Sequence, residues 1–289
     1  LHETGFWIRI MKLPEELRYI QNSLKPQKST HARMDGKICV ISGTTSGIGY
    51  EAAKQLAQGG AQLVMVCRNS DKARQVQHSL KADYGVDVDY FIADFQKLAE
   101  VQQAALEIRE KYPKIQVLVN NVGVFNKRRW LTPDGHEMTL GVIHLSSLLL
   151  TKLLIDNLKN GAPSRIINIS SEAHRFGGLN LKDLNWRKRP YIGLWAYASA
   201  KIAQIQTSMV LAERLKGSGV TVNAMHPGAV RTNIGMNNGL LYRLYTRLIL
   251  RCFLKDPVRS GEAIYYLAAE PTLEQVTGRF FNMTIDEKP

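Results

Sequence analysis

Short apolar runs alternate with helix-forming segments through most of the chain, and this alternation constrains the fold more than any other feature. The apolar runs are continuous, as expected for buried parallel strands, and cover residues 38–41, 63–67, 88–93, 117–120, 165–169 and 220–224. Helix-forming segments separate them at 50–58, 71–82, 98–111, 135–158 and 194–215. Repeated units of this kind predict an α/β Rossmann-like fold, a doubly wound parallel sheet of about seven strands with helices on both faces.

No linker or internal repeat interrupts this pattern, so we expect one domain over residues 35–289, preceded by an N-terminal arm at 1–34. The arm carries a short apolar cluster between Phe6 and Leu13 that contains two basic residues. The cluster is too short and too charged to span a bilayer. Two interpretations remain open: an arm that packs on the domain or is partly disordered, and an interfacial membrane anchor.

Directly after the first expected strand, residues 42–49 read Ser-Gly-Thr-Thr-Ser-Gly-Ile-Gly. Gly43 allows a tight turn, while Gly47 and Gly49 permit close approach of the backbone. Because a helix begins here, its first N–H groups can bind a pyrophosphate. The turn therefore predicts a dinucleotide site formed by Gly43, Thr45, Ser46, Gly47, Ile48 and Gly49.

Polar residues at the ends of the next three strands should border the same site, because parallel strands end at one edge of a sheet. Arg68 and Asn69 stand where an acid would bind NAD, and an arginine there can pair with the 2′-phosphate of NADP. We therefore expect NADP rather than NAD, with a solvated strand-end arginine as the alternative. Asp94 would contact the adenine or cap a turn. Asn121 and Gly123 would border the cofactor or form an ordinary turn.

Tyr197 and Lys201 are four residues apart in a helix-forming segment and therefore share one helix face. A neighbouring ammonium lowers the pKa of a phenol from about 10. Tyr197 can then exchange a proton with an alcohol oxygen while a nicotinamide carries the hydride. Ser171 ends the fifth strand on the same rim, where it would hold the substrate oxygen or serve as a helix or turn cap. The three residues together predict a catalytic group, in which Lys201 also binds the nicotinamide ribose.

With these motifs in this order, residues 36–281 resemble the short-chain dehydrogenase/reductase family. The shared features are the glycine turn, Asn-Asn-Val-Gly for the usual Asn-Asn-Ala-Gly, Ser171, Tyr197-x-x-x-Lys201 and His-Pro-Gly at 226–228. The resemblance implies that the nicotinamide end of the cofactor is bordered by Pro227, Gly228, Val230 and Thr232. Segments 168–174, 226–228 and 278–281 are similar to the retinol-dehydrogenase-like branch, which implies NADP and a small lipophilic alcohol or carbonyl substrate.

Ile143 departs from the family's pattern in the way that bears most on activity. The family usually has Asn at this position of Gly-Val-Ile-His-Leu, and that Asn is understood to hold a water molecule linking the lysine to solvent. Isoleucine can neither donate nor accept a hydrogen bond, and the adjacent His144 is turned away by about 100° along a helix. No nearby side chain obviously substitutes. We expect an active but slow enzyme, and the alternative is a dinucleotide-binding sensor or scaffold with little turnover.

The net charge of +13 calls for an anionic partner or surface. The basic residues are scattered and no nucleic-acid-binding motif accompanies them, so we expect no nucleic-acid partner. Residues 233–256 should form a lid in which Arg243, Arg247 and Arg251 make one basic stripe on an apolar helix. This lid is either a core-packed helix with a basic edge or a segment that lies on an anionic membrane, such as the endoplasmic reticulum.

Three cysteines, Cys39, Cys67 and Cys252, have no paired spacing. This usage indicates an intracellular, reducing compartment and no metal site. The sequence leaves open whether the chain forms a homo-oligomer.

Overall fold

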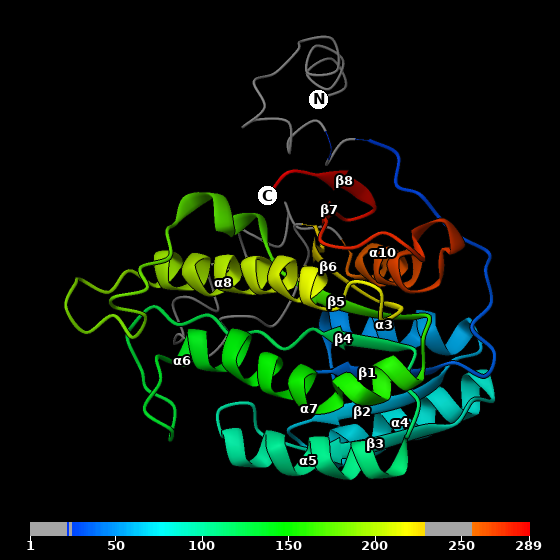
Figure 1. Cartoon of the computed structure of the whole chain (residues 1–289). Coiled ribbons are helices and arrows are strands. Elements are labelled where there is room, and N and C mark those ends of the chain that lie inside the picture. Colours follow the sequence, from blue (N-terminus) through cyan, green and yellow to red (C-terminus); the bar gives the residue numbers. More distant parts are fainter. Residues whose placement is uncertain (1–21, 23–24, 229–255) are drawn as a thin grey trace.

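The computed structural model describes residues 22, 25–228 and 256–289, and it confirms the predicted α/β fold (Figure 1). One sheet has the strand order β3-β2-β1-β4-β5-β6-β7-β8. Its strands are β1 Ile38–Ser42, β2 Gln62–Cys67, β3 Val88–Ile92, β4 Val117–Asn120, β5 Ser164–Ile169, β6 Val220–His226, β7 Phe280–Asn282 and β8 Ile285–Glu287. Strands β1 to β7 pair in parallel, and β8 adds an antiparallel edge. The strand order reverses between β1 and β4, which is where doubly wound sheets bind ligands.

Helices cover both faces of this sheet. Helices α3 (Gly47–Gln58), α4 (Ser70–Tyr84) and α10 (Val258–Ala269) pack on one face in a core that contains Ile41, Leu56 and Ile264. Helices α5 (Leu98–Lys111) and α7 (Ser146–Asn160) and the end of α8 (Gly193–Arg214) pack on the other, and α7 and α8 cross in front of the sheet in Figure 1. The fully buried strands explain why the sequence shows continuous apolar runs rather than alternation.

The segment predicted as one helix over 135–158 is divided. A short turn, α6 (Met138–Leu140), leads into a π-helical segment, η2 (Gly141–Leu145), and only then into α7. Gly135 has a left-handed φ of +80°, so the helix cannot begin there. The buried carboxylate of Glu137 caps the new start by accepting from the N–H groups of Thr139 (2.9 Å) and Leu140 (2.8 Å).

The described part of the N-terminal arm lies against the domain. The Lys28 N–H donates to Thr284 Oγ1 (2.8 Å), and the Tyr265 hydroxyl donates to the Ala32 carbonyl (2.6 Å). Met34 is buried in the core beneath α3 and α4. Residues 25–34 therefore pack as an extended strap over the C-terminal strands and α10, while the apolar cluster near the start of the chain lies outside the described residues.

Among the described helices, the one spanning residues 138–160 is long and apolar enough to cross a membrane by length and composition. Its side chains Leu150, Leu154 and Leu158 are fully buried in the core that also holds α5. Packing inside the domain therefore accounts for its apolar character.

Candidate active site

The glycine turn reaches the carboxyl edge of the sheet directly after β1. Gly43 and Gly47 have φ values of +74° and +60°, in the left-handed region that favours glycine. A Cβ on Gly49 would collide with the Gly43 carbonyl oxygen and with the Asn121 side-chain amide. Helix α3 begins within the turn, and the Ser46 side chain caps none of the described backbone N–H groups. These N–H groups can therefore receive the pyrophosphate of a dinucleotide.

Asn121, from the end of β4, holds the turn in place. Its Nδ2 donates to the carbonyl oxygens of Ser42 (3.0 Å) and Gly43 (3.2 Å), and its backbone N–H donates to Ser42 Oγ (3.0 Å). The structure thus brings Asn121 to the predicted site. There the side chain shapes the turn through backbone carbonyls, and Gly123, two residues further along the chain, is exposed.

The ends of β2 and β3 carry the three polar residues predicted near the adenosine. The Asn69 side chain accepts from the Lys72 N–H (2.8 Å) and caps α4, and Asp94 Oδ1 accepts from the Gln96 N–H (3.1 Å). Both side chains therefore act as caps in this structure. Arg68 is exposed directly after β2.

Ser171, Tyr197 and Lys201 meet at the same rim. Ser171 follows β5 and hydrogen-bonds the Tyr197 side chain, while its Oγ also accepts from the Ala173 N–H (3.1 Å). Lys201 is buried, and its Nζ lies 5.7 Å from the centre of the Tyr197 ring. The spacing of four on α8 brings the phenol and the ammonium to one helix face, as predicted.

The electrostatics of this group differ from the sequence-based expectation. Burial raises the pKa of Tyr197 to about 12, and the hydrogen bond with Ser171 acts in the opposite direction. Burial lowers the pKa of Lys201 to about 7. The Lys201 ammonium donates to the Ile169 carbonyl (2.6 Å) and to Gln204 Oε1 (3.3 Å). The pKa of Tyr197 is therefore raised in this structure, not lowered as the sequence predicted, because desolvation by burial outweighs the hydrogen bond with Ser171.

Gln204 is a polar neighbour of Lys201 that sequence reasoning missed. It is 3% exposed and lies three residues beyond Lys201 on the same face of α8. A second buried group links three elements: Asn120 Nδ2 donates to Asn168 Oδ1 (2.8 Å), and Asn168 Nδ2 donates to Ser208 Oγ (2.8 Å). These contacts could have been predicted from a polar residue inside an otherwise apolar strand or helix face, because such a residue indicates a buried hydrogen-bond partner.

Ile143 is fully buried in the π-helical segment η2, which packs against α8. Such segments occur often at functional sites. Burial also lowers the pKa of the neighbouring His144 to about 4, so this imidazole is neutral at physiological pH. This segment, which packs against α8, is therefore apolar at Ile143 and uncharged at His144.

A buried ionic group fixes the segment that follows Ser171. Arg175 Nε donates to Glu172 Oε2 (2.6 Å) and Arg175 Nη2 donates to Glu287 Oε1 (2.9 Å), which ties this segment to β8. Burial, together with the nearby Glu287 charge, raises the pKa of Glu172 to about 7 in spite of Arg175. Sequence reasoning did not predict this link between the C-terminal edge strand and the segment that follows Ser171.

The nicotinamide end of the predicted site is described only in part. The Pro227 carbonyl accepts from Ser260 Oγ (2.5 Å), and Gly228 has a φ of +87°. Val230, Thr232 and the lid segment up to residue 255 lie outside the described residues. Within the described ranges, no cluster of three or more His, Cys, Asp or Glu side chains could hold a metal ion.

Comparisons with known proteins identify the family of the chain. A family model for short chain dehydrogenases matches residues 37–240. Retinol dehydrogenase 13 from Homo sapiens is 36% identical over 269 residues, covering 91% of this chain and 80% of the relative. Retinol dehydrogenase 14 from Mus musculus is 37% identical over 268 residues, covering 88% and 80%.

A solved structure from Shigella flexneri, described as a short chain dehydrogenase complexed with NADP, matches with a TM-score of 0.70. It is 23% identical and the match covers 88% of this chain and 99% of that one, so it supports the fold alone. The fold and the matched sequence define a nucleotide-binding oxidoreductase of the α/β class. The chain belongs to the short-chain dehydrogenase family, and its sequence is retinol-dehydrogenase-like.

Proposed function

We propose that this chain transfers a hydride between NADP(H) and a lipophilic alcohol or carbonyl compound, with Tyr197 as the acid/base. The observation that carries the proposal is the meeting of the Ser171 hydroxyl, the Tyr197 hydroxyl and the buried Lys201 at the rim that holds the glycine turn. Both relatives named above are retinol dehydrogenases, which supports a lipophilic substrate such as a retinoid, a steroid or a fatty aldehyde.

In the direction of reduction, each of these side chains has a defined role. A dinucleotide bound at the glycine turn would supply the hydride. The Ser171 hydroxyl donates a hydrogen bond to the substrate carbonyl oxygen, and the Tyr197 hydroxyl gives its proton to that oxygen as the carbon is reduced. An alcohol and a tyrosinate result, and the Lys201 ammonium, 5.7 Å from the ring centre, stabilises the tyrosinate charge. Oxidation of an alcohol runs through the same groups in reverse.

The residues of the described site fit a dinucleotide, and Arg68 favours NADP. A Cβ at residue 49 would occupy space inside the glycine turn, where the backbone must approach a pyrophosphate closely. Glycine leaves this space open. Arg68 is exposed at the end of β2, whereas the side chains of Asn69 and Asp94 are engaged as caps. A guanidinium in this place pairs with a 2′-phosphate through charge-assisted hydrogen bonds.

The test separates proton transfer from cofactor binding. Tyr197→Phe should lower kcat for reduction of an apolar aldehyde by about 10²–10⁴-fold, because the acid is lost, and should leave the NADPH dissociation constant close to that of the wild type. Tyr84→Phe, at the end of α4, is the matched control and should keep both values. Substantial turnover in Tyr197→Phe would assign the acid/base role to another group.

A second candidate function is a dinucleotide-binding sensor or scaffold with little turnover. The specific observation in its favour is that Ile143 is fully buried and offers no hydrogen-bonding atom where the family usually has Asn. Tight NADPH binding together with no oxidation of NADPH by wild type or Ile143→Asn, across a broad panel of apolar carbonyls, would favour this candidate.

A further inference from the structure

Two loops at the N-terminal end of α8 form one surface. The first loop follows β4 and covers residues 127–131, Lys-Arg-Arg-Trp-Leu, and the second leads into α8 and covers residues 181–189, Leu-Lys-Asp-Leu-Asn-Trp-Arg-Lys-Arg. We call them together the basic loop surface. They touch directly, because Arg129 Nε donates to the Asn185 carbonyl (2.8 Å). Both lie at the left edge of Figure 1, beyond the ends of α6 and α8.

The fold holds the second loop in a defined shape. The buried Asp183 carboxylate accepts from the backbone N–H groups of Arg187 (2.8 Å) and Lys188 (3.1 Å). Trp186 is 4% exposed, and the Arg189 guanidinium stacks 3.5 Å from its ring centre. Because Trp186 and Asp183 anchor the loop from inside, the side chains of Arg187 and Lys188 are left on the outside.

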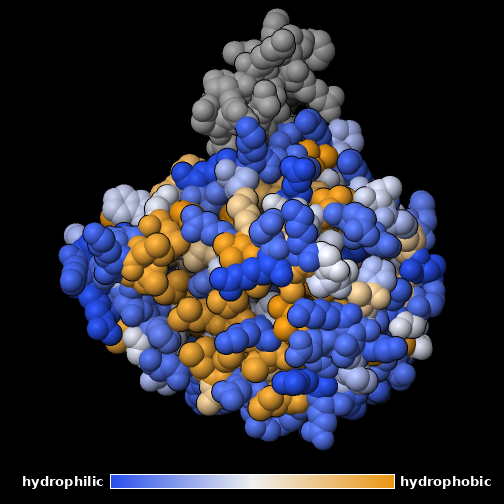
Figure 2. All heavy atoms as spheres, viewed as in Figure 1, coloured by the Kyte–Doolittle hydropathy of each residue, from blue (hydrophilic) through white to orange (hydrophobic). Residues whose placement is uncertain are grey.

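The exposed side chains of this surface are basic and apolar. Its two loops contain seven Lys and Arg residues against one acid, the buried Asp183. Between the cations stand four exposed apolar side chains: Trp130 (60% exposed), Leu131 (44%), Leu181 (75%) and Leu184 (37%). Figure 2 shows the same edge of the molecule as strongly hydrophilic surface bordered by hydrophobic surface.

We propose that the basic loop surface docks the protein on an anionic lipid bilayer. Lysine and arginine attract anionic headgroups, tryptophan favours the interfacial region, and exposed leucines gain free energy by entering the acyl boundary. A nucleic acid would satisfy the cations but would leave the exposed aliphatic side chains without an apolar contact. The proposal concerns described residues and is independent of the lid segment 233–256.

The basic loop surface lies close to Tyr197, so docking there would affect how a substrate reaches the site. The Phe125 ring, two residues before the first loop, makes an edge contact with the Tyr197 ring at 6.0 Å. Gly193 begins α8 so close to Asn126 that a Cβ there would collide with the Asn126 carbonyl. The first loop thus leads from the catalytic tyrosine to the exposed Trp130. Docking would place the entry side of a lipophilic substrate site next to the phase in which such a substrate dissolves.

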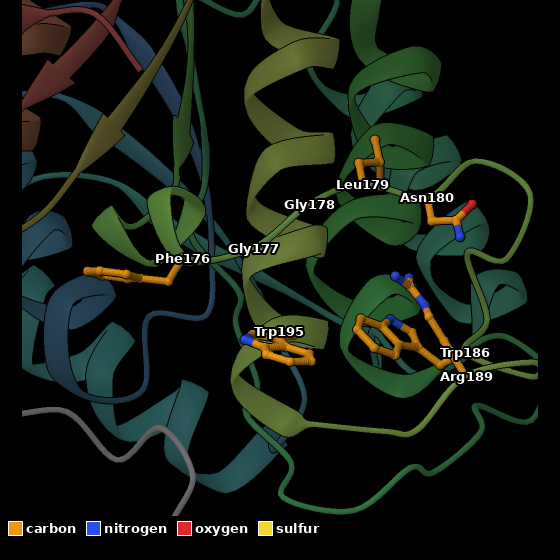
Figure 3. Close-up of a pocket in the computed structure, with 8 residues that line it drawn as sticks. All are labelled: Phe176, Gly177, Gly178, Leu179, Asn180, Trp186, Arg189 and Trp195. Carbon is orange, nitrogen blue, oxygen red and sulfur yellow. The ribbon is translucent and has the colours of Figure 1, made fainter. Parts of the chain in front are cut away.

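A groove of about 420 Å³ adjoins the second loop. Figure 3 shows Trp186 and Arg189 facing Trp195, which lies in the first turn of α8. Phe176 and Trp195, which also line it, are 56% and 47% exposed. The groove therefore offers apolar side chains beside a guanidinium, which suits an acyl chain with an anionic headgroup.

The test measures vesicle flotation of the full chain at several salt concentrations, with phosphatidylcholine vesicles that contain phosphatidylserine and with phosphatidylcholine alone. Each cation near an anionic leaflet raises binding roughly fivefold. Lys182→Gln/Arg187→Gln/Lys188→Gln should therefore lower the partition coefficient on acidic vesicles on the order of 100-fold. The matched control Lys72→Gln/Lys81→Gln/Lys114→Gln removes the same charge from exposed sites on α4 and before β4, and should lose far less.

One further variant, with two substitutions, tests the apolar part of the surface. Trp130→Ser/Leu181→Ser should lower the binding that persists at high salt, since that binding comes from apolar contact. Thermal unfolding and reduction of a water-soluble aldehyde serve as fold controls and should not change in any variant. Because vesicle binding is read without turnover, failure of the proposed enzymatic function would leave this result interpretable.

Three outcomes would overturn the proposal. The first is absence of wild-type binding to acidic vesicles. The second is that vesicle binding falls equally in the loop variant and in its matched control, or falls only in the lid variant Arg243→Gln/Arg247→Gln/Arg251→Gln. The latter result would assign the docking to the lid. The third is that the loop variant loses binding to duplex DNA or to an acidic protein while its vesicle binding stays at the wild-type level.

Discussion

Replacing Gly49 by alanine should damage the glycine turn while leaving the catalytic side chains in place. The new Cβ would collide with the Gly43 carbonyl oxygen and the Asn121 amide, and it would lie 3.0 Å from the Gly43 carbonyl carbon. Backbone must therefore move, and the Asn121 bonds to Ser42 (3.0 Å) and Gly43 (3.2 Å) are at risk. Overpacking costs about 1–3 kcal/mol and each lost hydrogen bond about 1 kcal/mol. The free energy of unfolding should fall by roughly 2–4 kcal/mol.

The assay reads stability and cofactor binding together. In a chain of this size 1 kcal/mol shifts Tm by about 2–4 °C, so Tm should fall by roughly 4–16 °C. The turn would also cease to present its N–H groups to the pyrophosphate, so NADP affinity, measured by calorimetry below Tm, should drop by about tenfold or more. Gly178→Ala is the matched control, since no described atom lies within 4 Å of its Cβ position. It should leave both values unchanged.

The result that refutes this reasoning is a Gly49→Ala protein with the Tm and the NADP dissociation constant of the wild type. The turn would then accommodate a side chain at no cost, and the close approach of Gly49 to Gly43 would have no role in holding a dinucleotide.

Three further variants extend these tests. Arg68→Asp should weaken NADP binding by about 10–100-fold, the value of a charge-assisted hydrogen bond, with little change for NAD; equal affinities of the wild type for both cofactors in calorimetry would contradict the assignment. Ile143→Asn should raise kcat several-fold at an unchanged NADP dissociation constant, and an unchanged kcat in an already fast enzyme would show that the proton relay is supplied otherwise. His144 has its pKa lowered to about 4 when folded and near 6.5 when unfolded, so its contribution to stability is present above the unfolded pKa and is lost as pH falls. Urea unfolding should show that the wild type loses about 2 kcal/mol more than His144→Leu between about pH 7 and pH 5, and equal losses would refute this.

The sheet could be predicted well because its signal is local. Each buried parallel strand is a continuous apolar run, and the run at 117–120 coincides with β4. The helix predicted over 135–158 shows the limit. Its long apolar sequence predicted that a helix exists there, but the π-helical segment Gly141–Leu145 and the cap by Glu137 depend on tertiary contacts that no short window contains.

The predicted catalytic group likewise has parts that the sequence could predict and parts that it could not. Spacing alone placed Tyr197 and Lys201 on one face of α8, and strand order placed Ser171 at the same rim. The sign of the Tyr197 pKa shift could not be read from spacing, because it depends on how deeply the phenol is buried. The contact between Lys201 and Gln204 depends on the depth of that helix face in the same way.

The most direct measurement of the proposed activity follows a single hydride. Wild-type protein is mixed with NADPH carrying deuterium at the transferred position of the nicotinamide and with an apolar aldehyde such as retinal, and the product is analysed by mass spectrometry. We expect the alcohol to contain one deuterium, with formation slowed by about 10²–10⁴-fold in Tyr197→Phe at unchanged NADPH binding. An alcohol without deuterium, or bound NADPH that is never oxidised by any member of an apolar carbonyl panel, would contradict hydride transfer by this site.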